Sequence, residues 1–179
     1  MPNVLCIGSA GYVGSHVCKA LLAAGYAPVT FDNLSTGHRS LVKFGPLVVG
    51  DILDTAKLVS VLRNFLPVGV IHLAGKAYVG ESVTDPALYY RNNVAGSLSV
   101  AEAMREAGVT NHLVFSSSCA IYRPHGRRIA EDMPKTPISP YGASKLVTEQ
   151  IFADFDQAYG FPHVNLRYFN AAGSGGDVG

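Results

Sequence analysis

Residues 3–14 have the sequence Asn-Val-Leu-Cys-Ile-Gly-Ser-Ala-Gly-Tyr-Val-Gly, and this stretch decides the fold of the chain. The apolar run from Asn3 to Ile7 is typical of a buried parallel strand. Glycines with the spacing GxxGxxG follow at once, and an apolar helix is expected from Tyr12 to about Ala24. A strand, a glycine loop and a helix in this order are typical of a nucleotide site.

Each glycine of the loop has an expected task. Gly8 would make the tight turn, Gly11 would let the backbone approach a pyrophosphate, and Gly14 would let the helix pack closely on the sheet. The phosphates would lie at the positive N-terminus of the helix. A plain turn is the alternative for a glycine triplet considered by itself.

An acidic residue follows the second expected strand, Pro28 to Phe31. It is Asp32, which lies 18 positions after Gly14. A carboxylate at about this separation binds both ribose hydroxyls of a dinucleotide, so Asp32 favours NAD over NADP. His38 and Arg39 could weaken that preference by folding back toward a 2′-phosphate, but no basic residue directly follows Asp32.

Strands and helices alternate along the rest of the chain. Further strands are expected at 47–50, 68–73, 112–115 and 164–168. Helices are expected at 54–65, 85–107 and 140–160, and a loop at 116–139. This order predicts an α/β fold with a doubly wound parallel sheet, which is an NAD(P)-binding Rossmann-like fold. We expect residues 1–170 to form this domain and residues 171–179 to form a glycine-rich tail.

Composition limits the class of protein. The chain has 179 residues, 48% of them hydrophobic, which is enough for one domain with a substantial core. Its net charge of +1 comes from 14 basic and 13 acidic residues that are interspersed, so no nucleic-acid surface is expected. We expect no signal peptide, no membrane span and a cytoplasmic location. Cys6, Cys18 and Cys119 are dispersed, which disfavours disulfides and a metal site and favours reduced thiols.

The pair Tyr141 and Lys145 is a candidate for acid/base chemistry. Four residues are one helical turn, so the phenol and the ammonium share a helix face. Ser139 is a plausible N-cap and Pro140 a plausible first helical residue. A solvated helix face is the alternative. Catalysis is favoured because the other candidates all follow strands and would meet in one crevice, namely Gly8, Asp32, Asp51, residues 73–75, residues 116–118 and residues 169–170.

Seven motifs occur in order over almost the whole chain: Gly8-Ser-Ala-Gly-Tyr-Val-Gly-Ser-His16, Asp32-Asn-Leu-Ser-Thr-Gly37, Val79-Gly-Glu-Ser82, Tyr89-Tyr-Arg-Asn-Asn93, Phe115-Ser-Ser-Ser118, Pro140-Tyr-Gly-Ala-Ser-Lys145 and Leu166-Arg-Tyr-Phe-Asn170. Together they resemble the extended short-chain dehydrogenase/reductase family, and within it the epimerases of nucleotide sugars. The family's dehydratases usually carry an acidic pair where this chain has Ser118 and Cys119, so an epimerase is favoured.

The resemblance implies NAD as cofactor, a UDP-sugar as substrate and a set of site residues. Catalysis would fall to Ser118, Tyr141 and Lys145, and substrate contact to Ser118, Tyr141 and Asn170. Cofactor contacts would come from Gly8, Gly11, Tyr12, Val13, Gly14, Asp32, Asn33, Leu34, Ser35, Thr36, Gly37, Asp51, Ile52, Leu73, Ala74, Gly75, Lys76, Ala77, Asn93, Tyr141, Lys145 and Phe169.

The implied reaction interconverts UDP-glucose and UDP-galactose. Tyr141 as phenolate, its pKa lowered by Lys145 and by the nicotinamide ring, would take the proton of the sugar 4-hydroxyl while C4 passes hydride to NAD. The 4-keto sugar would turn and receive the hydride on its other face. A homodimer through the helices starting near Asp85 and Pro140 is also implied.

Two departures from the family keep alternatives open. Members usually continue with a substrate domain after the Arg-Tyr-Phe-Asn segment, whereas this sequence stops at Gly179, and Arg123 stands where a glycine normally follows Tyr122. The alternatives are an NAD-binding module without epimerase activity and an epimerase of UDP-pentoses or UDP-uronates. At single positions, Ser118 could belong to a polar turn and Asn93 could be a satisfied buried amide.

Overall fold

The computed structural model describes residues 1–126 and 128–176. Its strands are β1 (Asn3–Ile7), β2 (Ala27–Asp32), β3 (Leu47–Val49), β4 (Gly69–His72), β5 (Leu113–Ser118) and β6 (His163–Tyr168). Its α-helices are α1 (Tyr12–Ala23), α2 (Thr55–Phe65), α3 (Val79–Thr84), α4 (Pro86–Tyr89), α5 (Gly96–Ala107) and α6 (Pro140–Tyr159). Shorter helical segments are η1 (Arg39–Leu41), η2 (Tyr90–Ala95) and η3 (Cys119–Ile121).

The strands form one parallel sheet in the order β3-β2-β1-β4-β5-β6. This order confirms the predicted doubly wound, Rossmann-like fold. Strand β2 pairs with one edge of β1, and β4 pairs with the other edge, so the direction in which strands are added reverses at β1. Ligands of such sheets bind at the strand carboxyl ends beside this switch point, so the topology places the site before any side chain is considered.

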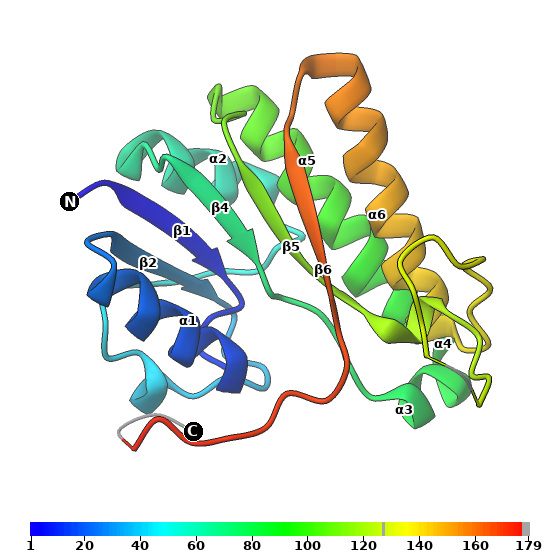
Figure 1. Cartoon of the computed structure of the whole chain (residues 1–179). Coiled ribbons are helices and arrows are strands. Elements are labelled where there is room, and N and C mark those ends of the chain that lie inside the picture. The colour runs from blue at the N-terminus through cyan, green and yellow to red at the C-terminus, as the bar shows by residue number, and fades with distance from the viewer. Residues whose placement is uncertain (127, 177–179) are drawn as a thin grey trace.

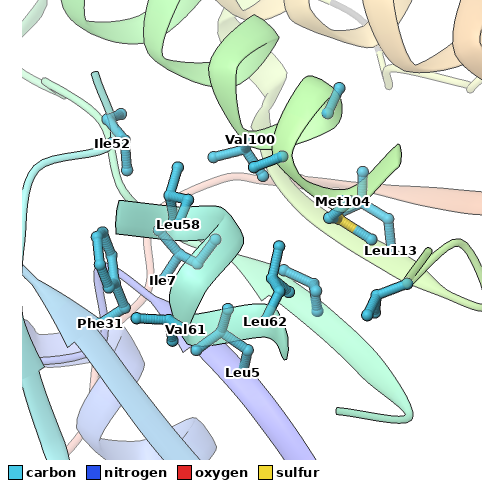
Figure 2. Packing of buried hydrophobic residues seen from close by; sticks show 14 of the residues in the cluster. Leu5, Ile7, Phe31, Ile52, Leu58, Val61, Leu62, Val100, Met104 and Leu113 are labelled. Carbon is cyan, nitrogen blue, oxygen red and sulfur yellow. The ribbon is translucent and has the colours of Figure 1, made fainter. Parts of the chain in front are cut away.

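Alternate residues of β1 supply two separate cores. Leu5 and Ile7 belong to the larger cluster, which α2 and α5 cover, as Figure 2 shows. Val4 and Cys6 belong to a smaller cluster with Cys18 of α1. In Figure 1, α1 accordingly lies on one face of the sheet, and α2, α5 and α6 lie on the other. Because both faces of β1 are buried, its sequence is apolar throughout rather than alternating.

Capping residues set several helix ends where the sequence predicted them. The side chains of Asp54, Asp85 and Ser139 accept hydrogen bonds from backbone amides in the first turns of α2, α4 and α6. Gly108 and Gly160 take left-handed conformations after α5 and α6. These contacts satisfy backbone groups that a helix end leaves unpaired.

Two predictions about the elements were wrong in part. The expected single helix at 85–107 is divided into α4, the π-helical segment η2 and α5, and the short helix α3 was not expected. Residues 116–118, expected in a loop, continue β5 because they pair with residues 166–168 of β6. The pairing partner lies fifty residues away in the sequence, so no local pattern indicated that β5 extends to residue 118.

The segment after β6 returns across the molecule to α1, as the red trace in Figure 1 shows. The hydroxyl of Tyr12 donates to the carbonyl oxygen of Gly173 at 2.6 Å, and Lys19 Nζ donates to that of Gly175 at 2.9 Å. Residues 177–179 of the expected tail lie outside the described residues. Of the helices in the described part of the chain, none has the length and apolar character needed to cross a membrane.

Replacing Gly14 with alanine should weaken the fold strongly. An added Cβ would lie 2.2 Å from the Cα of Ser9, which is backbone and cannot move aside alone. We expect Gly14→Ala to lower the free energy of unfolding in urea by about 2 kcal/mol or more. Gly80, also helical, has no atom within 4 Å of an added Cβ, so Gly80→Ala should be neutral or stabilise by up to about 1 kcal/mol. Equal effects of the two changes would contradict this explanation.

Candidate active site

A cavity of about 490 Å³ lies at the carboxyl ends of the strands, where the topology predicts a ligand. It extends from the glycine loop, past the ends of β2 and β4, to the first turns of α6. Its lining consists of Gly8, Gly11, Tyr12, Val13, Gly14, Phe31, Asp32, Asn33, Ser35, Thr36, Gly37, Gly50, Ile52, Leu73, Ala74, Gly75, Lys76, Ala77, Tyr78, Glu81, Asn92, Ser116, Tyr141 and Lys145. The predicted nucleotide loop and the predicted acid/base pair therefore share one cavity.

The glycine loop has little space on one side and open space on the other. Gly8 has a φ of +81°, and a Cβ there would lie 2.4 Å from the amide nitrogen of Ala74. The tight contact at Gly14 is with Ser9, two residues after β1 ends, so a glycine at this position lets α1 lie close to the end of that strand. A Cβ at Gly11 would meet only a carbonyl oxygen at 3.8 Å, and Gly11 lines the cavity.

The N-terminus of α1 is suited to an anion. Gly11 is its N-cap, no described side chain caps its first amides, and its first turn has no acidic residue. Unpaired amides and the helix dipole together attract phosphate groups. The open face of Gly11 lets a ligand reach these amides, which fits the pyrophosphate of a dinucleotide.

Asp32 lies at the carboxyl end of β2 with only 8% of its surface exposed. Its Oδ2 accepts from the amide of Ala10 at 3.0 Å, and its Oδ1 accepts from the amide of Leu34 at 2.8 Å. A carboxylate oxygen can accept more than one hydrogen bond. Asp32 therefore holds the glycine loop to the segment after β2 and keeps acceptor capacity toward the cavity that it lines, as a ribose-binding carboxylate requires.

Tyr141 and Ser118 meet because α6 begins directly against η3. A Cβ on Gly142 would lie 2.2 Å from the carbonyl oxygen of Ala120, so only a glycine permits this approach. Ser118 lies near enough to the Tyr141 phenol to lower its pKa by hydrogen bonding, and the Ser118 hydroxyl accepts from the amide of Ala120 at 3.1 Å. The ring of Tyr89 packs edge-on against Tyr141 with centroids 6.3 Å apart. The phenol is thus held between two fixed neighbours.

Burial dominates the protonation of both members of the acid/base pair. It raises the pKa of Tyr141, and the hydrogen bond with Ser118 offsets part of that rise. It lowers the pKa of Lys145 to about 8. The Lys145 ammonium donates to the carbonyl oxygen of Ser116 at 2.8 Å and lies 4.7 Å from the centre of the Phe115 ring. The pKa of Tyr141 is therefore raised rather than lowered in the chain alone, and Lys145 is not among the groups that shift it. The expected effect of the nicotinamide ring on this pKa stays a prediction.

Residues 4–179 match the family described as NAD dependent epimerase/dehydratase family. The chain belongs to this family. It is 48% identical over 173 residues to the UDP-glucose 4-epimerase of Rhizobium leguminosarum bv. trifolii, covering 96% of this chain and 53% of that protein. It is 49% identical over 175 residues to the UDP-glucose 4-epimerase of Azospirillum brasilense, covering 97% of this chain and 50% of that protein.

Solved structures of family members have the same fold. The UDP-glucose 4-epimerase from Brucella ovis in complex with NAD is 53% identical, with a TM-score of 0.94, over 97% of this chain and 53% of that chain. The UDP-glucose 4-epimerase of Thermus thermophilus, also in complex with NAD, is 41% identical, with a TM-score of 0.88, over 93% of this chain and 54% of that chain. The present chain thus spans about half the length of the epimerase-family relatives that it matches.

Six of the residues that the family resemblance assigned to the site do not line the cavity: Leu34, Asp51, Asn93, Ser118, Phe169 and Asn170. Asp51 accepts a hydrogen bond at 2.8 Å from the amide group of Asn33, which does line it. Phe169 and Asn170 are exposed beyond the end of β6. Contacts of these six residues with a cofactor or substrate stay predictions.

Asn93 is a buried amide whose side chain is engaged within the protein. Its Oδ1 accepts from the amide of Lys76 at 2.8 Å, and its Nδ2 donates to the Lys76 carbonyl at 3.0 Å and to Ser144 Oγ at 3.1 Å. Asn93 lies in η2, and such π-helical segments occur frequently at functional sites. The irregular helix thus ties the loop after β4 to α6.

Sequence reasoning missed five lining residues: Phe31, Gly50, Tyr78, Glu81 and Asn92. Ser116, which was expected in the crevice at the strand ends, does line the cavity, and Phe31 could have been found from the same strand-end rule. Tyr78 and Glu81 gave no local signal, because the buried hydroxyl of Tyr89 positions them by donating to the Tyr78 carbonyl and to Glu81. In residues 1–126 and 128–176, no group of three or more His, Cys, Asp or Glu side chains could hold a metal ion.

Lys145→Met should stabilise the chain in a pH-dependent way. Below pH 8 Lys145 is charged in both the folded and the unfolded chain, so the wild type bears the full cost of burying the charge. At pH 7 the free energy of unfolding of the variant should therefore exceed that of the wild type by about 2 kcal/mol. Between its folded-state pKa of about 8 and its ordinary value of 10.5, the folded state loses the proton first. The wild type then becomes more stable as pH rises, and the gain shrinks.

Urea unfolding at pH 7, 8, 9 and 10 would measure this difference. The exposed Lys57 provides the control: any effect of Lys57→Met should not shrink over the same range. A gain for Lys145→Met that is the same at every pH would show that the buried charge is not its cause.

Proposed function

We propose that this chain is the NAD-binding and catalytic portion of a UDP-glucose 4-epimerase, which interconverts UDP-glucose and UDP-galactose. One observation carries the proposal: a single cavity joins the open N-terminus of α1, Asp32 and the pair Tyr141 and Lys145. Further support comes from the family match and from relatives of that activity that are 48% and 49% identical.

The residues at the first end of the cavity would hold NAD. The first amides of α1 would bind the pyrophosphate, and Asp32 would accept hydrogen bonds from the adenosine ribose hydroxyls. Lys145, with an ammonium that can donate three hydrogen bonds, would hold the second ribose while keeping its bond to the Ser116 carbonyl. When bound, NAD would supply the acceptor and the donor of the hydride at sugar C4.

Tyr141 would be the acid/base residue. Its phenolate oxygen would accept the proton of the sugar 4-hydroxyl as C4 is oxidised, and would return that proton when C4 is reduced. Because burial raises the pKa of this phenol, a phenolate near neutral pH requires positive charge beside it, which Lys145 and the bound cofactor would provide. Ser118 would hydrogen-bond the same oxygen and fix the position of the proton.

A second candidate is an NAD-binding module that does not turn over a sugar. It is favoured by the positions of Ser118 and Asn170 outside the cavity lining. Well-oriented binding of substrate can supply about 7 to 11 kcal/mol of a barrier reduction. Without substrate contacts from Ser118 and Asn170, cofactor binding could therefore survive while turnover does not. An epimerase of UDP-pentoses or UDP-uronates is a variant of the first proposal.

Turnover separates these candidates. We expect the purified chain to release NAD on denaturation and, incubated with NAD and UDP-galactose, to form UDP-glucose that NMR detects. Tyr141→Phe should retain NAD but slow the reaction by about 100-fold or more, because it removes the acid/base group. Tyr26→Phe, a matched change remote from the cavity, should change neither property. NAD without product would reject the epimerase in favour of the binding module, and product only from a UDP-pentose or UDP-uronate would change the proposed substrate.

We also propose a homodimer through the helices that begin at Pro86 and Pro140. Tyr90, Leu98 and Val147 are large apolar side chains that stay exposed on η2, α5 and α6. Apolar side chains gathered on neighbouring helices are typical of a protein interface. The cytoplasmic location expected from the sequence stays a prediction.

Leu98→Glu should convert the dimer to a monomer, because it would bury a charge at the contact. Light scattering at micromolar concentration measures the change. Leu22→Glu is the matched control, since Leu22 is similarly exposed, at 41% against 38%, but lies on α1 across the sheet (Figure 1). A monomeric wild type would contradict the dimer.

A further inference from the structure

Arg167 and Glu149 form a buried ion pair on the side of the sheet that α6 covers. Arg167 Nε donates to Glu149 Oε1 at 2.9 Å and Nη2 donates to Oε2 at 2.8 Å, so the guanidinium binds both carboxylate oxygens. The two side chains are 19% and 6% exposed. Ser117 Oγ also donates to Glu149 Oε1, at 2.6 Å. Burying two charges costs desolvation energy and gives little net stability, so the pair calls for another explanation.

The free edge of this guanidinium reaches the segment 119–139. Arg167 Nη1 donates to the hydroxyl of Tyr122 and, at 3.3 Å, to the carbonyl oxygen of Glu131. The Tyr122 hydroxyl donates to the same carbonyl at 3.2 Å. Tyr122 is buried, whereas Arg123 and most described residues after it up to Ile138 are exposed. The ion pair is therefore an anchor for a segment with few other buried contacts.

This segment joins two residues of the proposed catalytic machinery. Ser118 immediately precedes it, and Tyr141 follows it in the first turn of α6. Arg167 is the register partner of Ser117 across β5 and β6, and Glu149 lies two turns along α6 from Tyr141. One ion pair thus connects both strands, the helix and the middle of the segment.

We infer that Arg167, held by Glu149, is a positioning residue that fixes the segment 119–139 through Tyr122 and Glu131, and thereby sets Tyr141 against Ser118. The inference rests on the proposed function for the roles of Ser118 and Tyr141. The bidentate guanidinium suits this task, because its planar donors fix an orientation that a lysine ammonium would not.

Tyr122→Phe provides the sharpest test, since it removes one hydroxyl from the anchor and leaves both charges paired. Hydrogen exchange should accelerate by about tenfold or more at residues 119–139 and in the first turn of α6, with β1, β4 and α5 unchanged. Arg167→Lys keeps the charge but loses the planar guanidinium that binds both Glu149 oxygens. It should accelerate exchange at the same residues. Arg63→Lys alters the exposed ion pair with Glu106 and is the matched control, expected to change nothing.

The pKa of Tyr141 provides a readout that general loosening of the fold would not move. In both variants the hydrogen bond from Ser118, which lowers this pKa, should weaken, so the pKa should rise by about half a unit or more. NMR titration of ¹³C-labelled tyrosines would measure it, with Tyr141→Phe identifying the signal.

Three results would overturn the inference: unchanged exchange in both variants, acceleration spread over the whole sheet, or an unchanged Tyr141 pKa. These measurements need no turnover. A wild type that fails to epimerise would therefore reject the proposed function while the positioning role of Arg167 is still decided by exchange and titration.

Discussion

The turn at Gly8 is the constraint on which the rest of the structure depends. Its amide donates to the carbonyl of Phe31 at 2.7 Å, and the preceding carbonyl of Ile7 accepts from the amides of Leu73 and Ala74 at 2.8 and 3.0 Å. The ends of β1, β2 and β4 are thus held together within hydrogen-bonding distance. Only a residue without a Cβ fits between them. The open N-terminus of α1, the position of Asp32 and the start of the cavity all follow from this one turn.

At the opposite end of the cavity, the reactive groups Tyr141 and Lys145 lie in buried positions that cost folding free energy. Lys145 keeps an ammonium in a buried position, where its pKa falls, and Tyr141 keeps a phenol where its pKa rises. Each shift means that the fold disfavours the charged form, so a phenolate beside an ammonium is unstable in the chain alone. Groups with shifted pKa values that share a cavity are typical of catalytic sites. The proposed chemistry is consistent with a fold in which burying Tyr141 and Lys145 lowers the free energy of unfolding but places both groups in the cavity.

Buried polar side chains connect the elements that form the two ends of the cavity, through hydrogen bonds and one ion pair. Asn93 ties the loop after β4 to α6, and the pair Arg167 and Glu149 ties β5 and β6 to α6. Apolar packing alone tolerates small shifts of a helix along a sheet, whereas hydrogen bonds between fixed partners do not. Polar residues around α6 gather near the site, whereas the larger apolar core, to which α6 contributes Phe152, lies mainly beneath α2 and α5.

The amino-acid sequence by itself determined the local features. The glycine loop, the caps at Asp85 and Ser139, and the alternation of strands and helices could all be predicted, because each depends on residues adjacent or one turn apart. Candidates at strand ends could be named for the same reason. Tertiary structure alone decided the division of the helix around η2, the extension of β5, the lining by Tyr78 and Glu81, and the direction of the Tyr141 pKa shift. Those features depend on partners far along the chain and on how completely water is excluded, and neither property is encoded in any one stretch.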